Sequence, residues 1–253
     1  MLSDAHVHVG YYSRKGREEP FYYSPRRVAG VLNRCVVDEF IVSSTCAQVA
    51  GIGTADIVRE ARELKRIAGD RAHVFFWLSG RRYDEDKAMA WFKSGLFEGI
   101  KLHEGETAWM RRRRGDLRKV LSFAADNGLP VMFHSGLNEG NRPLELAAVA
   151  KEFPGVRFNF AHCRPMAEMA GVVAECPNVW TDTAYMAFDE FPKLRDYDWR
   201  GRLMFGTDLP VWQAHESAGL TKRYREYARA FRATGFEAAA DVAFRGFVNR
   251  KVT

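Results

Sequence analysis

The sequence is poor in cysteine and has no long apolar run, and both absences restrict where the protein can work. Only four cysteines occur among its 253 residues, and Cys35, Cys46, Cys163 and Cys176 show no paired spacing. This pattern is typical of reduced thiols in a cytoplasmic protein. No apolar run approaches the roughly 18 residues that a membrane helix needs, and the first residues lack the basic and apolar parts of a signal peptide. We therefore expect a cytoplasmic protein without membrane contact.

The sequence also lacks a proline- or serine-rich linker, which argues against division into several domains. Hydrophobic residues make up 47% of the chain, enough to build a large core and to exclude general disorder. Barrels of alternating strands and helices are routinely about 250 residues long and form one domain. We expect residues 1–253 to be a single domain.

Eight short apolar runs predict the strands of a parallel sheet. Their ends recur at spacings close to the length of about 30 residues of a strand–helix–strand unit. Most are nearly continuous apolar stretches, as expected for strands buried on both faces. Eight such units favour an α/β fold, a closed TIM-like (β/α)₈ barrel with C-terminal helices, over an open doubly wound sheet. The predicted strands are Met1–Val9, Phe40–Thr45, His73–Leu78, Gly99–His103, Pro130–His134, Val156–His162, Val179–Thr183 and Leu203–Thr207.

Helices are expected between these strands. Thr54 and Asp116 are typical N-cap residues for two of them. Pro143 and Pro165 suit the first turns of two more. The C-terminal tail is expected to be helical with one break near Gly235.

Five of the seven histidines and one aspartate fall where predicted strands end. Side chains two residues apart on a strand share a face, so His6 and His8 can bind one ion. A catalytic zinc needs three or four nitrogen or oxygen ligands and one position open to water. His134 and Asp208 would complete such a set from strands five and eight. The sequence thus predicts one divalent ion, zinc in the first place and manganese in the second, at one mouth of the barrel. The residues are His6, His8, His103, His134, His162 and Asp208.

The predicted chemistry follows from the ion. A bound metal lowers the pKa of its water to about 7 and so creates a nucleophile at neutral pH. Asp208 could bind the ion and also take the proton, and His162 would polarise a substrate oxygen or act as an acid or base. His73 opens its strand at the opposite mouth, and we interpret it and His215 as structural histidines.

Five segments that carry these residues resemble motifs of the amidohydrolase superfamily, most closely the amidohydrolase 2 branch that includes aminocarboxymuconate-semialdehyde decarboxylase. The resemblance runs from Asp4 to about Asn249, and it implies a distorted barrel with a mononuclear metal. It matches His6, His8, His134 and Asp208 to the metal ligands, and His162 to the catalytic histidine of strand six. The segments are Asp4–His8, Gly99–His103, Leu129–Gly136, Ala161–Cys163 and Phe205–Pro210.

Lys101 and His103 share a face of strand four. In binuclear relatives a lysine on this strand is carboxylated and bridges two metals, but in this branch it is generally not a bridge. We therefore favour one metal and interpret Lys101 and His103 as substrate-binding residues. A charged group paired inside the barrel mouth is the alternative for Lys101.

Four functions compete. The first is a metal-dependent hydrolase of an amide, ester or lactone, and the second is a decarboxylase or hydratase of a small unsaturated or aromatic acid. The chain is shorter than the characterised decarboxylases and lacks their long insertions, which weakens the second. A TatD-type nuclease is third. Such proteins usually carry a strand-four glutamate and a final Glu-Thr-Asp, whereas this chain has Gly-Ile-Lys-Leu-His and Gly-Thr-Asp at those places. A barrel with only a structural zinc is fourth.

The partners are less defined than the site. The net charge of +6 permits an acidic partner, and no nucleic-acid motif accompanies it. Arg111–Arg114 is either a solvated loop or an attractor for a carboxylate-bearing small substrate. The long aromatic segment Tyr11–Arg27 is a lid, a pocket wall, an oligomer contact or plain surface packing. The sequence leaves open whether the chain forms a homo-oligomer.

Overall fold

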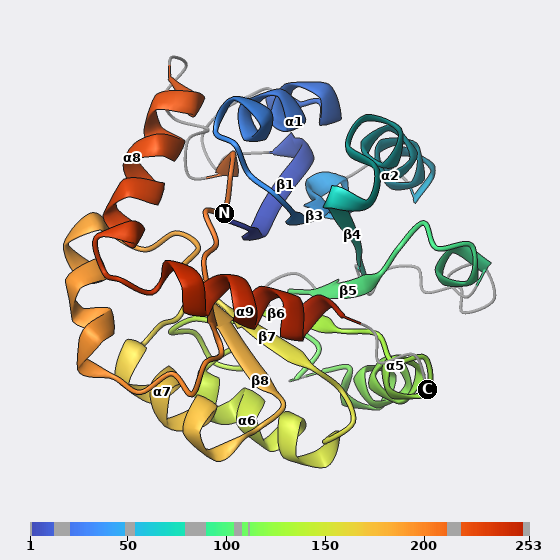
Figure 1. The fold of residues 1–253 in the computed structure, drawn as a ribbon. Coiled ribbons are helices and arrows are strands. Elements are labelled where there is room, and N and C mark those ends of the chain that lie inside the picture. The colour runs from blue at the N-terminus through green and yellow to red at the C-terminus, as the bar shows by residue number, and fades with distance from the viewer. Residues whose placement is uncertain are drawn as a thin grey trace.

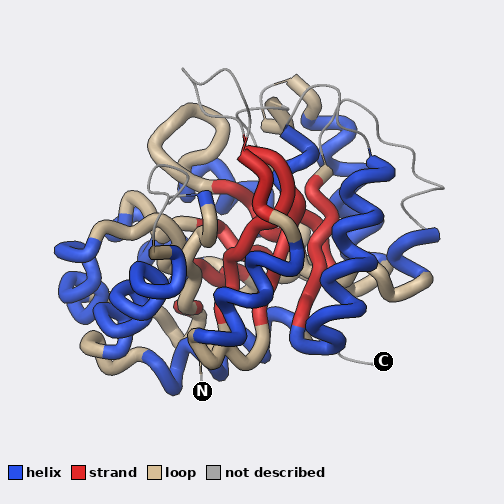
Figure 2. The backbone as a smooth tube through the Cα atoms, turned by 90° about the horizontal axis from the view of Figure 1, so that it is seen from above, coloured by secondary structure: helices blue, strands red, loops and turns tan. Residues whose placement is uncertain are grey.

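The computed structural model has a curled sheet of strands surrounded by helices (Figure 1). It describes residues 2–12, 21–48, 54–78, 90–103, 108–110, 112–211 and 219–249. Seen at right angles, the strands stand together in the middle of the molecule with helices on both sides (Figure 2). The strands are β1 (Asp4–Tyr12), β2 (Phe21–Tyr23), β3 (Phe40–Ser44), β4 (Ala72–Trp77), β5 (Gly99–Leu102), β6 (Val131–His134), β7 (Phe158–Ala161), β8 (Val179–Asp182) and β9 (Leu203–Met204).

The strand order is β2-β1-β3-β4-β5-β6-β7-β8-β9, and every neighbouring pair except β1 and β2 is parallel. The expectation of eight parallel strands in a barrel of the TIM type is therefore confirmed. Parallel neighbours also bring all their carboxyl ends to one edge of the sheet, which is where side chains from distant parts of the sequence meet.

Strand β2 was not foreseen from the sequence. The segment Tyr11–Arg27 was interpreted as a loop, but its first residues extend β1, and Phe21–Tyr23 pairs with β1 in antiparallel register, with Gly10 opposite Tyr23. Aromatic residues favour such pairing because their side chains pack across strands; the rings of Tyr11 and Tyr22 lie 4.6 Å apart. The centre of this segment, residues 13–20, lies outside the described residues.

The barrel is closed by an irregular segment rather than by a regular strand. Strand β9 has only two residues, and the chain that follows it supplies the remaining bonds to β1. The amide of Ala5 donates to the carbonyl of Phe205 at 2.7 Å, and that of His8 donates to the carbonyl of Leu209 at 2.6 Å. The buried carboxylate of Asp4 reinforces this seam, because it accepts from both the amide and the hydroxyl of Thr207. Closure by these few bonds makes the barrel distorted.

Two expected helix starts are wrong by a few residues. Asp116 lies in the first turn of α5 instead of capping it, and its carboxylate pairs with Arg113 at 3.1 Å. Pro165 precedes α7 as its N-cap residue, whereas Pro143 begins α6 as expected. The break near Gly235 is confirmed. The helices are α1 (Pro25–Arg34), α2 (Thr54–Ala68), α5 (Arg114–Asp126), α6 (Pro143–Glu152), α7 (Met166–Glu175), α8 (Leu220–Arg232) and α9 (Glu237–Val248), with 3₁₀ turns at Thr45–Gln48, Gly69–Arg71 and Phe188–Asp196.

Helix α9 covers the end of the barrel where the strands begin (Figure 1). The ring of Phe244 lies 5.7 Å from that of His73, near the start of β4, and Phe247 packs on Phe75 and Trp180. These phenylalanines join a small core inside the barrel, and a larger core fills the layer between the strands and the outer helices. Burial of each large apolar side chain stabilises the fold by roughly 1.5–3 kcal/mol. Because α9 covers this end, the carboxyl mouth is the end of the barrel at which an active site is expected.

None of the helices in the described segments is both long enough and apolar enough to cross a lipid bilayer.

Candidate metal centre at the barrel mouth

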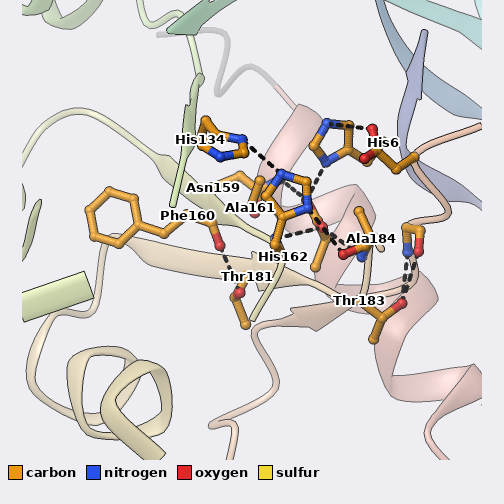
Figure 3. Close-up of polar contacts among 12 residues, drawn as sticks. His6, His134, Asn159, Phe160, Ala161, His162, Thr181, Thr183 and Ala184 are labelled. Atoms are coloured by element: carbon orange, nitrogen blue, oxygen red, sulfur yellow. Dashed lines mark hydrogen bonds and ion pairs between the residues drawn. The ribbon is translucent and has the colours of Figure 1, made fainter. Parts of the chain in front are cut away.

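The residues predicted to form a site are brought together at the carboxyl mouth of the barrel. His6 and His8 lie on β1, Lys101 lies on β5 with His103 next to its end, and His134 ends β6. His162 follows β7, and Asp208 follows β9. Most of these side chains are almost fully buried, and Figure 3 shows His6, His134 and His162 turned toward one another.

His6, His8 and Asp208 form the tightest group of potential metal ligands. The two Nε2 atoms are 3.1 Å apart, and Oδ1 of Asp208 lies 3.0 Å from Nε2 of His8 and 3.6 Å from Nε2 of His6. Ligand atoms held about 2.1 Å from one ion in tetrahedral or octahedral geometry are roughly 3.0–3.4 Å apart. Two of the three distances lie in this range and the third, 3.6 Å, is slightly longer, so the three atoms could hold a single divalent ion after a small adjustment.

The second ring nitrogen of each histidine fixes which atom carries the proton. Nδ1 of His6 donates to Oδ2 of Asp182 at 3.2 Å, and Nδ1 of His8 donates to the carbonyl oxygen of Ser43 at 3.2 Å. The hydroxyl of Ser43, 3.0 Å from Nδ1 of His8, can accept this hydrogen bond as well. An imidazole that donates through Nδ1 in its neutral form has a lone pair on Nε2. Two lone pairs and a carboxylate oxygen thus converge on one point, an arrangement that a cation stabilises. The donor set fits a metal for this reason as well as for its spacing.

Asp182, at the end of β8, organises the mouth and was missed in the sequence. One oxygen accepts from His6 and from Nδ2 of Asn159 at 2.7 Å, and the other accepts from the amides of His162 and Ala184 at 3.1 and 2.9 Å. Burial alone would raise its pKa, but the attraction of His6 and these hydrogen bonds outweigh burial and hold the pKa well below its usual range. A carboxylate at the end of a predicted barrel strand was the available indication, the same one that identified Asp208.

His134 lies against the other histidines rather than inside the tight group. Nδ1 of His162 donates to the carbonyl oxygen of Ala184 at 3.1 Å, which leaves its Nε2 as an acceptor. Nδ1 of His134 donates to that Nε2 at 2.9 Å (Figure 3), so the lone pair of His134 is on its own Nε2. The ring of His134 also stacks on that of His103, with centroids 4.1 Å apart. His134 could therefore serve as a further ligand through Nε2, in addition to the group formed by His6, His8 and Asp208.

Four of the histidines at the mouth, His8, His103, His134 and His162, have pKa values below the ordinary value of 6.5. Burial lowers the pKa of His8 to about 4, against the opposing effect of Asp208, and lowers that of His103 to about 3. Burial, together with neighbouring positive groups, holds the pKa values of His134 and His162 well below 6.5. A metal binds the neutral form of imidazole, so these shifts favour metal binding at physiological pH.

Lys101 is almost fully buried, and its amine lies beside His6. Nζ donates to Nε2 of His6 at 3.1 Å, so the amine has a partner inside the mouth, and the contact of Lys101 with substrate stays a prediction. Burial lowers its pKa to about 8, although Asp182 and Asp208 oppose the shift. The amine also lies 5.7 Å from the ring centre of Trp77, a residue that the sequence interpretation passed over.

Trp77 ends β4 and forms an aromatic wall with its neighbours. Its indole stacks on His103 at 5.8 Å with an interplanar angle of 18°, and it contacts His8 at 5.4 Å. Lys101 and His103, both predicted to bind substrate, therefore lie on one side of the mouth beside a flat apolar surface.

Several mouth residues have backbone angles that side chains normally avoid. His162, Cys163, Tyr185 and Asp208 have φ values of 78°, 47°, 60° and 62°. Each such residue costs about 1–3 kcal/mol, and strain of this kind concentrates at functional sites, where the surrounding fold maintains it. The strain at His162 and Asp208 therefore accompanies the placement of their side chains at the mouth.

The arginines of the Arg111–Arg114 run that the structure describes are either exposed or already paired. Arg113 pairs with Asp116 and covers the ring of Trp109 at 5.9 Å, so its guanidinium is already engaged. Arg112 and Arg114 are exposed. Arg111, like His215, lies outside the described residues.

Comparison with known proteins agrees with this geometry. Residues 4–241 match the family model described as Amidohydrolase, and no curated protein matches the chain. A solved amidohydrolase from Burkholderia multivorans with bound zinc has a TM-score of 0.70 at 14% identity, covering 98% of this chain and 99% of that one.

Two further solved structures share the fold. A probable 2-pyrone-4,6-dicarboxylic acid hydrolase from Acinetobacter baumannii with citric acid bound has a TM-score of 0.69 at 12% identity, covering 98% of both chains. A 4-oxalomesaconate hydratase from Rhodopseudomonas palustris has a TM-score of 0.58 at 12% identity, covering 97% of this chain and 98% of that one.

Proposed function

Since this chain belongs to the amidohydrolase family, we propose that it is a metal-dependent hydrolase that cleaves an amide, ester or lactone of a small, carboxylate-bearing substrate. The observation that carries the proposal is the convergence of the unprotonated Nε2 atoms of His6 and His8 with the carboxylate of Asp208. The zinc of the Burkholderia relative supports a divalent ion of this kind.

Four residues are proposed to hold the ion: His6, His8, His134 and Asp208. Zinc is the first candidate and manganese the second. When bound, such an ion supplies Lewis acidity and lowers the pKa of water to about 7. His134 joins the ligands by presenting its Nε2, whose lone pair is kept available because Nδ1 donates to His162.

Asp208 is proposed to take the proton of the attacking water. Its second oxygen is available for this because the contacts with His6 and His8 both use Oδ1. Burial opposes ionisation, but the attraction of His6 outweighs burial and holds the pKa of Asp208 well below its usual range. The carboxylate is thus ionised when the substrate arrives.

His162 is proposed to carry the proton onward. Its Nε2 is an acceptor in this arrangement, so it can stabilise a developing oxyanion or protonate a leaving group only after it gains a proton there. Lys101 and His103 are proposed to contact the substrate, with Trp77 as the adjoining wall.

The proposal is tested with full-length protein purified without chelator. We expect about one divalent ion per chain by elemental analysis. We also expect hydrolysis of at least one member of a panel of carboxylated lactones, esters and amides, lost with chelator and restored by zinc or manganese. Asp208→Asn should abolish the activity, and the exposed Asp198→Asn should not. Protein with no bound ion that no metal activates would refute the proposal.

Decarboxylation or hydration of a small unsaturated acid is the second candidate, because the hydratase from Rhodopseudomonas palustris shares the fold. The same residues could transfer a proton to or from carbon instead of oxygen. Release of carbon dioxide or uptake of water by unsaturated and aromatic acids, with no hydrolysis of the first panel, would favour this candidate over hydrolysis.

A further inference from the structure

The loop after β6 leaves a small polar corner beside the metal centre. Gly136 stands two residues after His134, and its amide donates to the carbonyl oxygen of Asn141 at 2.9 Å. A Cβ atom placed on Gly136 would meet Nε of Arg164 at 3.7 Å and both amide atoms of the Asn141 side chain at 3.8 Å. We call these three residues, Gly136, Asn141 and Arg164, the Gly136 corner. A guanidinium and an amide thus face the place where glycine has no side chain.

Asn141 is buried with unused hydrogen-bonding capacity. Its side chain is 3% exposed, and its Oδ1 has no hydrogen-bond partner among the residues that the structure describes. Leaving a buried amide group unsatisfied typically costs about 1–3 kcal/mol. The two ends of an asparagine amide are interchangeable by rotation, so either the oxygen or the NH₂ group can face the corner. No hydrogen bond of the NH₂ group is found among the described residues either, so a ligand that accepts hydrogen bonds could take one from it, while Oδ1 would need a separate donor.

Arg164 brings a positive charge to the same place. It stands two residues after His162, is half-buried, and lies over the ring of Tyr185 at 5.6 Å. Within the described ranges no carboxylate pairs with it, whereas Arg142, at the end of the same loop as Gly136, pairs with Glu168 at 2.7 Å. Stacking on a ring leaves the edge of the guanidinium free, and that edge matches the two oxygens of a carboxylate.

The Gly136 corner lies next to the histidines of the mouth in the chain. Gly136 and Arg164 each stand two residues after a histidine of the mouth, His134 and His162. Tyr185, the residue that supports the guanidinium, is among the residues with positive φ, at 60°. The fold therefore maintains a strained conformation at the residue on which Arg164 rests.

A neighbouring cavity is a weaker candidate for an anion. It has a volume of about 260 Å³ and lies between the 185–188 segment and α8, with Arg223 as its cation. Arg223 pairs with Glu226 at 3.7 Å and packs on the ring of Phe188 at 4.3 Å, so an anion there would compete with an existing partner.

We propose that the Gly136 corner binds a carboxylate of the substrate, through the guanidinium edge of Arg164 and the side-chain NH₂ of Asn141. The reacting bond would then be presented to the metal centre from the side of His134 and His162. The statement that this carboxylate belongs to a hydrolysed substrate rests on the proposed function. The binding of the anion does not.

The test uses isophthalate, a planar dicarboxylate, and its neutral diamide as probes in calorimetric titrations of the full chain with and without zinc. Gly136→Ala is the sharpest variant, because its φ is not positive and its Cβ would make only ordinary contacts. The added methyl should fill the corner and weaken isophthalate binding by about tenfold or more, and Arg164→Met should weaken it by about 10- to 100-fold. Gly155→Ala and Arg142→Met are the matched controls and should leave the affinity unchanged.

Three results would overturn the proposal: no isophthalate binding by the parent protein, equal affinity in Gly136→Ala, or equal weakening of the neutral diamide. Binding that depends on the corner in a protein that hydrolyses nothing would sink the proposed function and leave this inference standing. Conversely, hydrolysis with an unchanged KM for carboxylated substrates in Arg164→Met and Gly136→Ala would sink this inference alone.

Discussion

Histidine has opposite properties at the two ends of this barrel. At the carboxyl mouth, His8 is buried among other imidazoles and beside Lys101, and its pKa falls to about 4. At the amino end, His73 is also largely buried, but Nδ1 lies 2.8 Å from Glu98 and Nε2 lies 2.9 Å from Glu39. Burial would lower the pKa of His73 too, yet the two carboxylates outweigh burial and raise it.

The difference shows that the balance between burial and carboxylate partners decides the pKa of a buried histidine: the single carboxylate of Asp208 does not outweigh burial at His8, whereas two carboxylates outweigh it at His73. Two carboxylates favour the charged form of His73. Its contacts join β4 to Glu39, before β3, to Glu98, before β5, and to helix α9, which is a structural role. The mouth lowers the pKa values of His8, His103, His134 and His162 and holds His162 at a positive φ, an arrangement that favours neutral imidazoles able to bind a metal. The predictions that follow test this division.

The largest effect is expected from Asp208, which contacts both His6 and His8. Asp208→Asn keeps the shape but removes the negative charge and the proton acceptor. We expect kcat to fall by about 10³-fold or more, since general-base catalysis alone contributes roughly 10²–10⁴-fold. Steady-state kinetics with elemental analysis of the same sample would measure it. Retention of more than a tenth of the activity would show that the base is another residue.

Substitutions of His162 and His134 are expected to have different effects on zinc content, although the two rings share a hydrogen bond. His162→Asn should lower kcat by about 10²-fold while zinc content stays near that of the parent, because its proposed role is proton transfer. His134→Asn should lower zinc content along with activity. Parallel metal analysis and kinetics of the two variants would separate the roles. Zinc loss in His162→Asn with zinc retained in His134→Asn would reverse the assignment.

Asp182 is expected to act on the metal through His6. Asp182→Asn removes the acceptor that fixes the tautomer of His6, and loss of such partners typically weakens metal binding by about 10–100-fold. Zinc titration against a competing chelator would measure the affinity, and excess zinc should restore most of kcat. Asp198→Asn, an exposed aspartate paired with Arg200, is the control. An unchanged zinc affinity would contradict this role.

The sequence predicted the parts of the molecule that depend on local pattern. The strands and the mouth residues followed from apolar runs that end in histidine or aspartate, and the parallel order brought those ends together. Strand β2 was missed because a three-residue aromatic pairing has no periodicity to detect. Asp182 and Asn141 were missed because an orienting role is defined by partners from other strands and loops, and such partners have no fixed spacing in sequence.

The smallest effect is expected at the amino end and concerns stability alone. His73→Gln removes a cation from between Glu39 and Glu98 and should lower the free energy of unfolding by about 1.5–3 kcal/mol, the range for a hydrogen bond to a charged group. Because the pKa of His73 is raised in the folded protein, this contribution is fully present below 6.5, its ordinary value, and is lost as the pH rises through the raised value.

Urea unfolding of the zinc-free parent and of His73→Gln at pH 6 and pH 9 would therefore show the larger difference in free energy of unfolding, here called the gap, at pH 6. The pKa of Glu98 is lowered, so its own contribution is present above 4.5 and lost only as the pH falls further, which keeps the gap intact at pH 6. The variant should keep the kcat of the parent at neutral pH, since His73 lies at the closed end of the barrel. A gap that grows with pH would mean that His73 is neutral in the folded protein, and the contrast between the two ends would fail.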